Sequence, residues 1–173
     1  VDYTVRLVGM TPYMANQSSI GIAWSNTSYQ NERGFKNENT YTTVAYRIPG
    51  EGSIDDLSMS EGAKEEKISS SVEWIAFKQQ FFSSVLIAAD DFLYADVAYD
   101  TAAPDSGLMK AFSATMAVPY TAQTERYDFS FYFGPNKYAV LKKIDDAQGE
   151  PLLLDRLIPM GWGIIGWVSR WLV

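Results

Sequence analysis

The stretch Tyr-Asp-Phe-Ser-Phe-Tyr-Phe at residues 127–133 decides the fold class of this 173-residue chain. Four aromatic residues occupy alternate positions, the spacing that places side chains on one face of a β-strand. The same alternation recurs at residues 3–7, 20–24, 44–48, 93–99 and 112–118. Many short strands without interleaved helices predict a mainly β protein, an antiparallel β-sandwich.

Two apolar stretches are less regular than these. Residues 72–77 and 81–89 are apolar at neighbouring positions, which is typical of central strands covered on both sides. Turn-forming residues separate the segments at 25–27, 49–52, 89–91 and 104–107. Residues 51–67 are polar and charged, and we expect a mobile surface loop there.

The pattern changes after Gly134. Pro135 suits the first turn of a helix, and residues 136–144 are expected to form a short helix with Tyr138 and Leu141 on one side. We therefore expect residues 1–134 to form the sandwich. Residues 135–173 are expected to form a helical extension that packs on the sandwich and leads toward a membrane.

The C-terminal stretch Met-Gly-Trp-Gly-Ile-Ile-Gly-Trp-Val-Ser-Arg-Trp-Leu-Val, residues 160–173, predicts an amphipathic helix. At about 100° per residue, one face carries Ile164, Ile165, Trp167, Val168, Trp171 and Leu172. The other face carries Gly163, Gly166, Ser169 and Arg170. Such a helix either packs on a sheet or lies at the water–lipid boundary, where Trp is favoured and Arg170 reaches the headgroups. We favour the second interpretation.

Composition excludes several classes of function. The net charge is −7 and no basic stripe is present, which argues against nucleic-acid binding and against broad electrostatic adhesion to anionic lipid. The chain has no Cys and no His, which excludes thiolate nucleophiles, Cys/His zinc sites and Ser-His-Asp triads. Residues 1–10 do not resemble a secretion signal, and residues 157–173 are too short to span a bilayer.

Acidic pairs are the remaining candidates for catalysis or metal binding. The pairs are Asp55–Asp56, Asp90–Asp91 and Asp145–Asp146. We expect all three in turns, and neighbouring residues of a strand face opposite sides, which disfavours a glycosidase. Asp90, Asp91, Asp96 and Asp100 lack the spacing of a calcium loop. We therefore predict no catalytic residue, metal ligand or cofactor, and expect Trp24 and Trp74 in the core rather than on a sugar-binding face.

Three segments, in the same order as in the family, carry a resemblance to a known family. Residues 72–84, Val-Glu-Trp-Ile-Ala-Phe-Lys-Gln-Gln-Phe-Phe-Ser-Ser, resemble a block of the large periplasmic domain of YidC/Oxa-type bacterial membrane protein insertases. Residues 132–137, Tyr-Phe-Gly-Pro-Asn-Lys, are similar to that family's corner between a strand and a helix. Gly161-Trp162 lies where the family has an amphipathic helix on the periplasmic membrane surface. The residues that carry the match, for which we expect structural roles, are Trp74, Gln80, Phe81, Gly134 and Pro135.

This resemblance implies part or all of a β-supersandwich. It also implies a non-catalytic domain of an insertase and chaperone on the periplasmic side of the inner membrane. The implied partners are Sec translocon components and nascent membrane proteins, reached through the parent protein. Lipid headgroups would meet the C-terminal helix, with Trp162, Trp167 and Trp171 at headgroup depth. A carbohydrate-binding or adhesion sandwich of a secreted protein remains the alternative.

Overall fold

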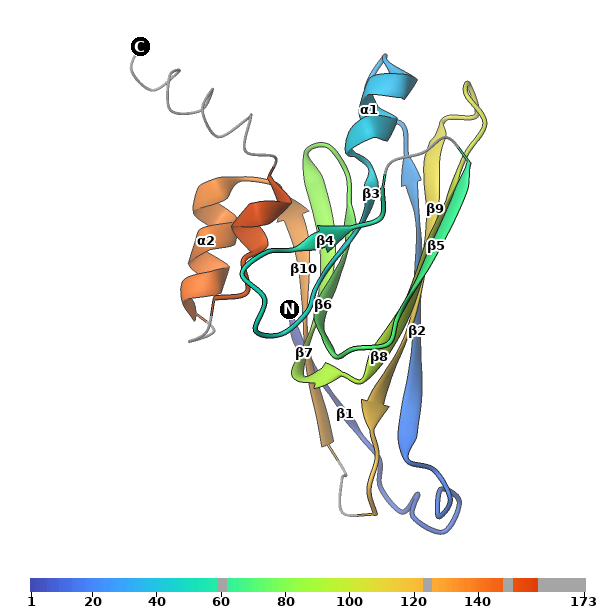
Figure 1. Cartoon of the computed structure of the whole chain (residues 1–173), viewed down its shortest axis with the longest axis vertical. Helices are drawn as coiled ribbons and strands as arrows, with labels where there is room; N and C mark the ends of the chain where they lie inside the picture. Colours follow the sequence, from blue (N-terminus) through green and yellow to red (C-terminus); the bar gives the residue numbers. More distant parts are fainter. Residues whose placement is uncertain (59–61, 123–125, 148–150, 159–173) are drawn as a thin grey trace.

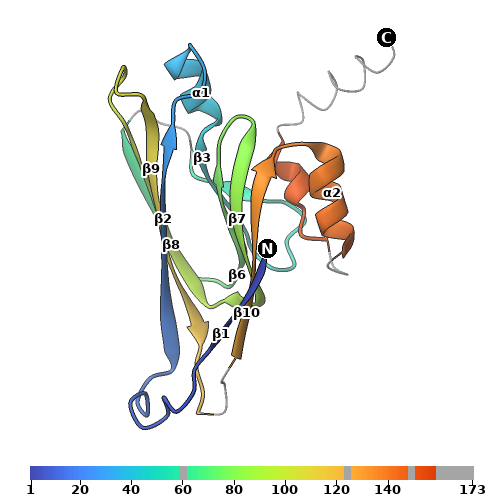
Figure 2. The ribbon, with the colours of Figure 1, turned by 180° about the vertical axis from the view of Figure 1, so that it is seen from behind.

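The chain folds into two antiparallel sheets packed face to face (Figures 1 and 2). The computed structural model describes residues 1–58, 62–122, 126–147 and 151–158. The six-stranded sheet has the order β1 (Asp2–Arg6), β10 (Arg126–Pro135), β7 (Phe82–Phe92), β6 (Val72–Lys78), β3 (Thr43–Arg47) and β4 (Asp55–Asp56). The four-stranded sheet has the order β2 (Ser19–Tyr29), β9 (Leu108–Pro119), β8 (Tyr94–Thr101) and β5 (Ala63–Ile68). The predicted antiparallel β-sandwich is confirmed.

Alternating residues of the strands fill the space between the sheets. On β9 the inward positions carry Phe112, Ala114 and Met116, all buried, as the alternation predicts. On β10 the alternation fails at one end, because Phe133 is 61% exposed although Phe129 is buried. The ladder of β1 with β10 covers residues 126–130 and Val1 adds backbone hydrogen bonds to Phe131, so Phe133 lies beyond the part of β10 that has β1 as a neighbour.

The central strands β6 and β7 are covered on both sides, as predicted. Trp74 and Ile75 are neighbours on β6, point to opposite faces and are both 0% exposed. Two helices cover the outer face at this point (Figure 1): α2 (Tyr138–Ala147) and the short 3₁₀ helix η1 (Leu154–Leu157). The second layer explains why these strands are apolar at neighbouring positions.

The prediction of a mobile loop at residues 51–67 was wrong. Strand β4 lies in this stretch, and β5 pairs along its whole length with β8. Leu57, between the two strands, is completely buried. The charged sequence of β5 suits an edge strand, because only one of its sides is paired and its charges discourage pairing with other chains.

The acidic pairs were also placed wrongly. Asp55–Asp56 forms β4, Asp90–Asp91 lies within β7, and Asp145–Asp146 lies in α2 rather than in a turn. After β7 the chain reverses at Leu93 instead. Asp91 has a φ of 38°, a conformation that Asp tolerates better than most residues.

The helices differ from expectation at two points. A helix α1 (Phe35–Tyr41) was not predicted, because its sequence is polar and lacks an apolar period. The predicted helix after Pro135 is α2, but Pro135 ends β10 opposite Phe82 instead of opening the helix. Leu141 is buried whereas Tyr138 is exposed, so the two side chains do not share a buried face. None of the helices in the described ranges has the length and apolar character needed to cross a bilayer.

Candidate functional site

The outer face of the six-stranded sheet carries a second apolar cluster. Its sheet side consists of Ala45, Trp74, Ala76, Val85 and Ile87, from β3, β6 and β7. Its cover consists of Leu141 of α2 with Leu152, Leu154 and Leu157. Ala45 and Ala76 lie opposite each other across β3 and β6, and their small side chains let the cover approach the sheet beside the Trp74 ring. The cluster fixes residues 151–158, which directly precede residues 159–173.

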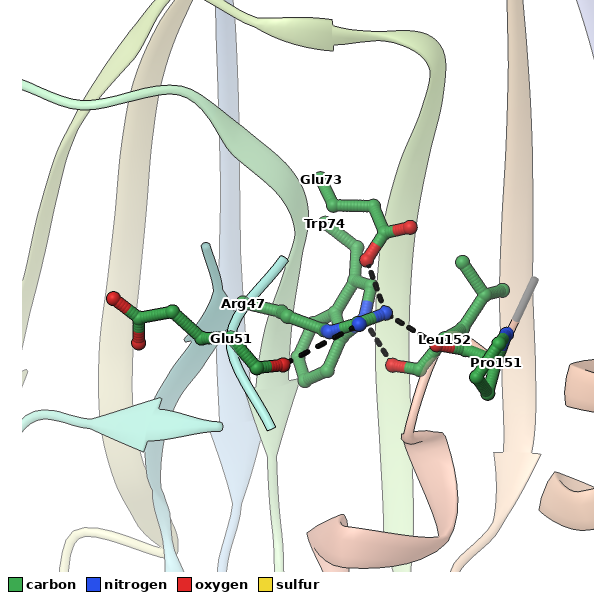
Figure 3. A network of polar contacts seen from close by, with 6 residues as sticks. All are labelled: Arg47, Glu51, Glu73, Trp74, Pro151 and Leu152. Atoms are coloured by element: carbon green, nitrogen blue, oxygen red, sulfur yellow. Dashed lines mark hydrogen bonds and ion pairs between the residues drawn. The ribbon is translucent and has the colours of Figure 1, made fainter. Parts of the chain in front are cut away.

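Trp74 binds this cover through a hydrogen bond. Its indole Nε1 donates to the Leu152 carbonyl oxygen at 2.7 Å, and both residues are buried (Figure 3). A buried carbonyl without a donor is costly, so the bond favours one position of the backbone at this point. Trp74, which the sequence singled out as a family-motif residue, therefore attaches the C-terminal part of the chain to the sheet.

Arg47 makes the second attachment (Figure 3). Its Nη1 forms an ion pair with Glu73 Oε2 at 2.5 Å and also donates to the Pro151 carbonyl oxygen. Nη2 lies 3.5 Å from the Glu51 carbonyl oxygen. The side chains of Arg47 and Glu73 are only 9% and 16% exposed, so water screens the pair weakly. We call the Arg47 and Trp74 contacts to residues 151–152, together with the Arg47–Glu73 ion pair, the clamp.

The two family-like motifs meet in space at a corner. Asn136 Nδ2 donates to the Gln79 carbonyl at 2.8 Å and to the Gln80 carbonyl at 3.4 Å. The Asn136 backbone N–H donates to the Phe81 carbonyl at 2.7 Å, and Ser83 Oγ donates to Asn136 Oδ1 at 2.7 Å. The hairpin between β6 and β7 is thereby joined to the end of β10. Gln80 and Phe81 were identified in the sequence as residues that match the family motif. Their contacts with Asn136, however, are made by their backbone carbonyls and not by their side chains.

Gly134 has a local steric role at this corner. The Tyr132 ring folds over it and donates its hydroxyl to the Pro135 carbonyl at 2.7 Å. A Cβ at residue 134 would lie 2.6 Å from the Tyr132 hydroxyl oxygen, closer than atoms in contact tolerate. The absence of a side chain at residue 134 therefore lets the Tyr132 ring close the corner. Burial of this ring raises the pKa of Tyr132.

Sequence reasoning missed the buried polar residues. Lys110 is 0% exposed; its Nζ donates to the Thr42 carbonyl at 2.5 Å and lies 3.8 Å from the centre of the Tyr99 ring. Burial lowers the pKa of Lys110 to about 8. The sequence did contain a signal for this burial. Lys110 lies two positions before Phe112, and residues two apart on a strand share a face.

A second buried charge holds α1 in place. The Glu38 carboxylate accepts hydrogen bonds from the backbone N–H groups of Asn31 and Glu32 at 3.0 and 2.9 Å. This carboxylate closes the loop between β2 and α1. The contact is structural, because the carboxylate oxygens are already used by the chain itself.

An open groove of 880 Å³ lies beside the clamp on the outer face of the sheet. Its lining includes Arg47, Glu73, Asp90, Asp128 and Arg126, so it is mostly polar. Arg126 forms an ion pair with Asp128 at 2.7 Å, which lowers the pKa of that carboxyl together with a hydrogen bond from Thr4. In the described part of the chain no cluster of acidic side chains is arranged to hold a metal ion, and this includes the four Asp residues considered for calcium.

The expected membrane-interface residues lie outside the described residues. They are Trp162, Ile164, Ile165, Trp167, Val168, Arg170, Trp171 and Leu172. The two remaining Trp residues are core residues, as predicted. Trp74 belongs to the outer cluster, and Trp24 stacks on Phe77 between the sheets with ring centres 3.9 Å apart.

These features define a class, a two-sheet β-sandwich whose outer face holds the start of a C-terminal segment. A family model described as the YidC periplasmic domain matches residues 1–173, and the chain belongs to this family. The family is a non-catalytic domain of an inner-membrane insertase and lies on the periplasmic side.

Several proteins similar to this chain are named membrane protein insertase YidC. The chain is 38% identical over 99% of its length to a membrane protein insertase YidC of Phocaeicola vulgatus. It is 34% identical to the proteins of that name from Bacteroides fragilis and Parabacteroides distasonis, over 99% and 100% of its length. In each case it spans 28% of the relative.

Proposed function

We propose that this domain serves a membrane protein insertase that helps inner-membrane proteins insert and fold, alone or with the Sec translocon. Its part is to hold the segment that leads from the sandwich to the membrane. The observation that carries the proposal is the clamp. Arg47 and Trp74 bind the carbonyls of Pro151 and Leu152, a few residues before residue 159. Because the chain is bound at residues 151–152, the segment that follows residue 158 has few orientations available relative to the sandwich.

The proposed division of the chain follows from this role. Residues 1–134 form the sandwich that serves as a rigid base, and residues 135–173 form the extension. Within the extension, residues 160–173 form an amphipathic helix at the lipid headgroup region. Trp162, Trp167 and Trp171 sit at headgroup depth, and Arg170 reaches the phosphates.

Vesicle binding tests the proposal. The chain is mixed with vesicles of phosphatidylethanolamine and phosphatidylglycerol, and the bound fraction is measured by sedimentation. Replacing Trp162, Trp167 and Trp171 together by Gln is expected to reduce binding at least tenfold, since each buried aromatic side chain contributes on the order of 1.5–3 kcal/mol. Replacing the exposed Tyr13 by Gln serves as the control and should leave binding unchanged.

The same substitutions in the full-length insertase test the biological role. We expect cells that depend on the Trp variant to insert membrane proteins more slowly than cells with the Tyr13 variant. Photo-crosslinking from the sandwich surface in the full-length protein tests the Sec contact. Wild-type vesicle binding and wild-type insertion by the Trp variant would refute the role of the helix.

A further inference from the structure

Three parts of the chain come together at one end of the sandwich. These are the hairpin between β6 and β7, the end of β10 and the start of α2, joined by the Asn136 contacts. The loop after β2 reaches the same end, where Asn31 Nδ2 donates to Gln79 Oε1 at 3.3 Å. Figure 1 shows this end at the top, and residues 151–158 run beside α2 and finish at the level where β10 ends. Figure 2 shows the same arrangement from behind.

This end exposes aromatic side chains. Phe82, Phe133 and Tyr138 are 57%, 61% and 59% exposed, and Phe81 and Tyr29 are also exposed. They come from the hairpin, the end of β10, the start of α2 and the end of β2, so the tertiary structure gathers them. The Phe133 ring stacks on Phe131 with ring centres 5.2 Å apart. An aromatic ring already held by packing loses little conformational entropy when it binds a surface.

Basic side chains lie among these aromatic residues. Arg33, Lys36 and Lys137 are exposed there, against the exposed acidic residues Glu32 and Asp105. The chain as a whole has a net charge of −7. Exposed Phe and Tyr beside exposed Arg33, Lys36 and Lys137 suit the headgroup region of an anionic bilayer, where aromatic rings enter the interface and cations bind phosphates.

We infer that this end of the sandwich lies on the lipid headgroup region, with Phe82, Phe133 and Tyr138 inserted and Lys36 and Lys137 at the phosphates. The inference rests on the proposed function, because a membrane-lying segment that starts just after Ile158 brings the adjoining end of the sandwich to the same surface. The domain then stands on the membrane by this end. The end with Tyr13 and Tyr94 points away from the membrane.

Site-specific labelling tests this orientation. The chain has no Cys, so single substitutions Phe82→Cys, Tyr138→Cys and Tyr13→Cys each give one labelled site. With an environment-sensitive fluorophore and vesicles of phosphatidylethanolamine and phosphatidylglycerol, we expect a blue shift at residues 82 and 138. We expect no shift at residue 13, which belongs to the loop between β1 and β2 at the opposite end.

A loss-of-binding experiment complements the labels. The double variant Phe82→Ser/Tyr138→Ser is expected to bind these vesicles about tenfold more weakly, since each partly inserted ring contributes apolar contact. The matched control Tyr13→Ser/Tyr94→Ser removes two exposed aromatic residues from the opposite end and should bind like the wild type. Far-UV circular dichroism verifies that both variants are folded.

The outcomes separate this inference from the proposed function. Vesicle binding that depends on Trp162, Trp167 and Trp171, without a shift at residues 82 and 138, overturns the inference and leaves the proposed function standing. A shift at these residues only when Sec components are present also overturns it and indicates a protein partner. Binding that survives the Trp substitutions but is lost in the double variant supports the inference and refutes the role of the helix.

Discussion

Replacing Trp74 by Phe is expected to loosen the clamp and destabilise the domain. The substitution removes the Nε1 donor and leaves the buried Leu152 carbonyl without this partner, which costs about 1–3 kcal/mol. The smaller ring also leaves a cavity in a site that is 0% exposed, which adds about 1–2 kcal/mol. The free energy of unfolding should therefore fall by about 2–5 kcal/mol, a large share of the total stability of a typical domain.

Two measurements check this prediction. Urea unfolding followed by far-UV circular dichroism gives the change in stability, because the signal does not depend on the removed Trp. Hydrogen exchange of residues 151–158 reports the clamp directly and should become faster in Trp74→Phe. The control is Trp24→Phe, which changes a half-buried ring between the sheets and should cost less while leaving exchange of residues 151–158 unchanged.

Two outcomes would contradict a role of the Trp74 hydrogen bond in holding residues 151–158. A loss below about 0.5 kcal/mol, the range of ordinary surface substitutions, would show that the Trp74 hydrogen bond does not hold the cover. Unchanged exchange at residues 151–158 despite a large loss of stability would show that Trp74 contributes by packing alone. In that case the orientation of the C-terminal segment would not depend on this contact.

Further predictions concern the corner, the buried Lys and the ion pair. Gly134→Ala should displace the Tyr132 ring and lower the free energy of unfolding by about 1–3 kcal/mol, measured by urea unfolding, whereas an unchanged midpoint would show that the ring moves without cost. Because burial lowers the folded-state pKa of Lys110 to about 8, the unfolded chain binds more protons above this pH, so stability should rise from pH 8 toward pH 10. Lys110→Met should flatten that rise, and an equal slope in the variant would assign the effect to other groups. Arg47→Met should lower the free energy of unfolding by about 2–4 kcal/mol, because Glu73 is left largely buried without this cation. Adding Glu73→Gln should recover part of that loss. Strict additivity of the two substitutions in this double-mutant cycle would contradict a coupled pair.

Alternation along the sequence predicted most strands and their inward faces. Phe112, Ala114 and Met116 point inward because residues two apart on a strand share a face, whatever the strand pairs with. The same rule applies to Lys110, two positions before Phe112, but it was not used and the burial of Lys110 was missed. The prediction of strands failed for β5, because its charged residues suggested a loop.

The candidate site was predicted only in part. Trp74 and the corner at Gly134 were singled out as family-motif residues, but their contacts were not visible in the sequence. Arg47 and Glu73 were not recognised at all, because an isolated Arg and Glu in two strands resemble ordinary surface residues. No local pattern showed that a later segment covers the outer face of the sheet at this point.

The sequence by itself therefore determined the class of fold, the inward faces of most strands and the resemblance to the insertase family. These depend on local geometry and on short motifs. Only the tertiary structure decided that Trp74 binds Leu152, 78 residues further along the chain, and that aromatic residues from four elements share one end of the sandwich. Such contacts depend on the order in which strands pair and on where the chain returns, and neither is encoded in the spacing of neighbouring residues.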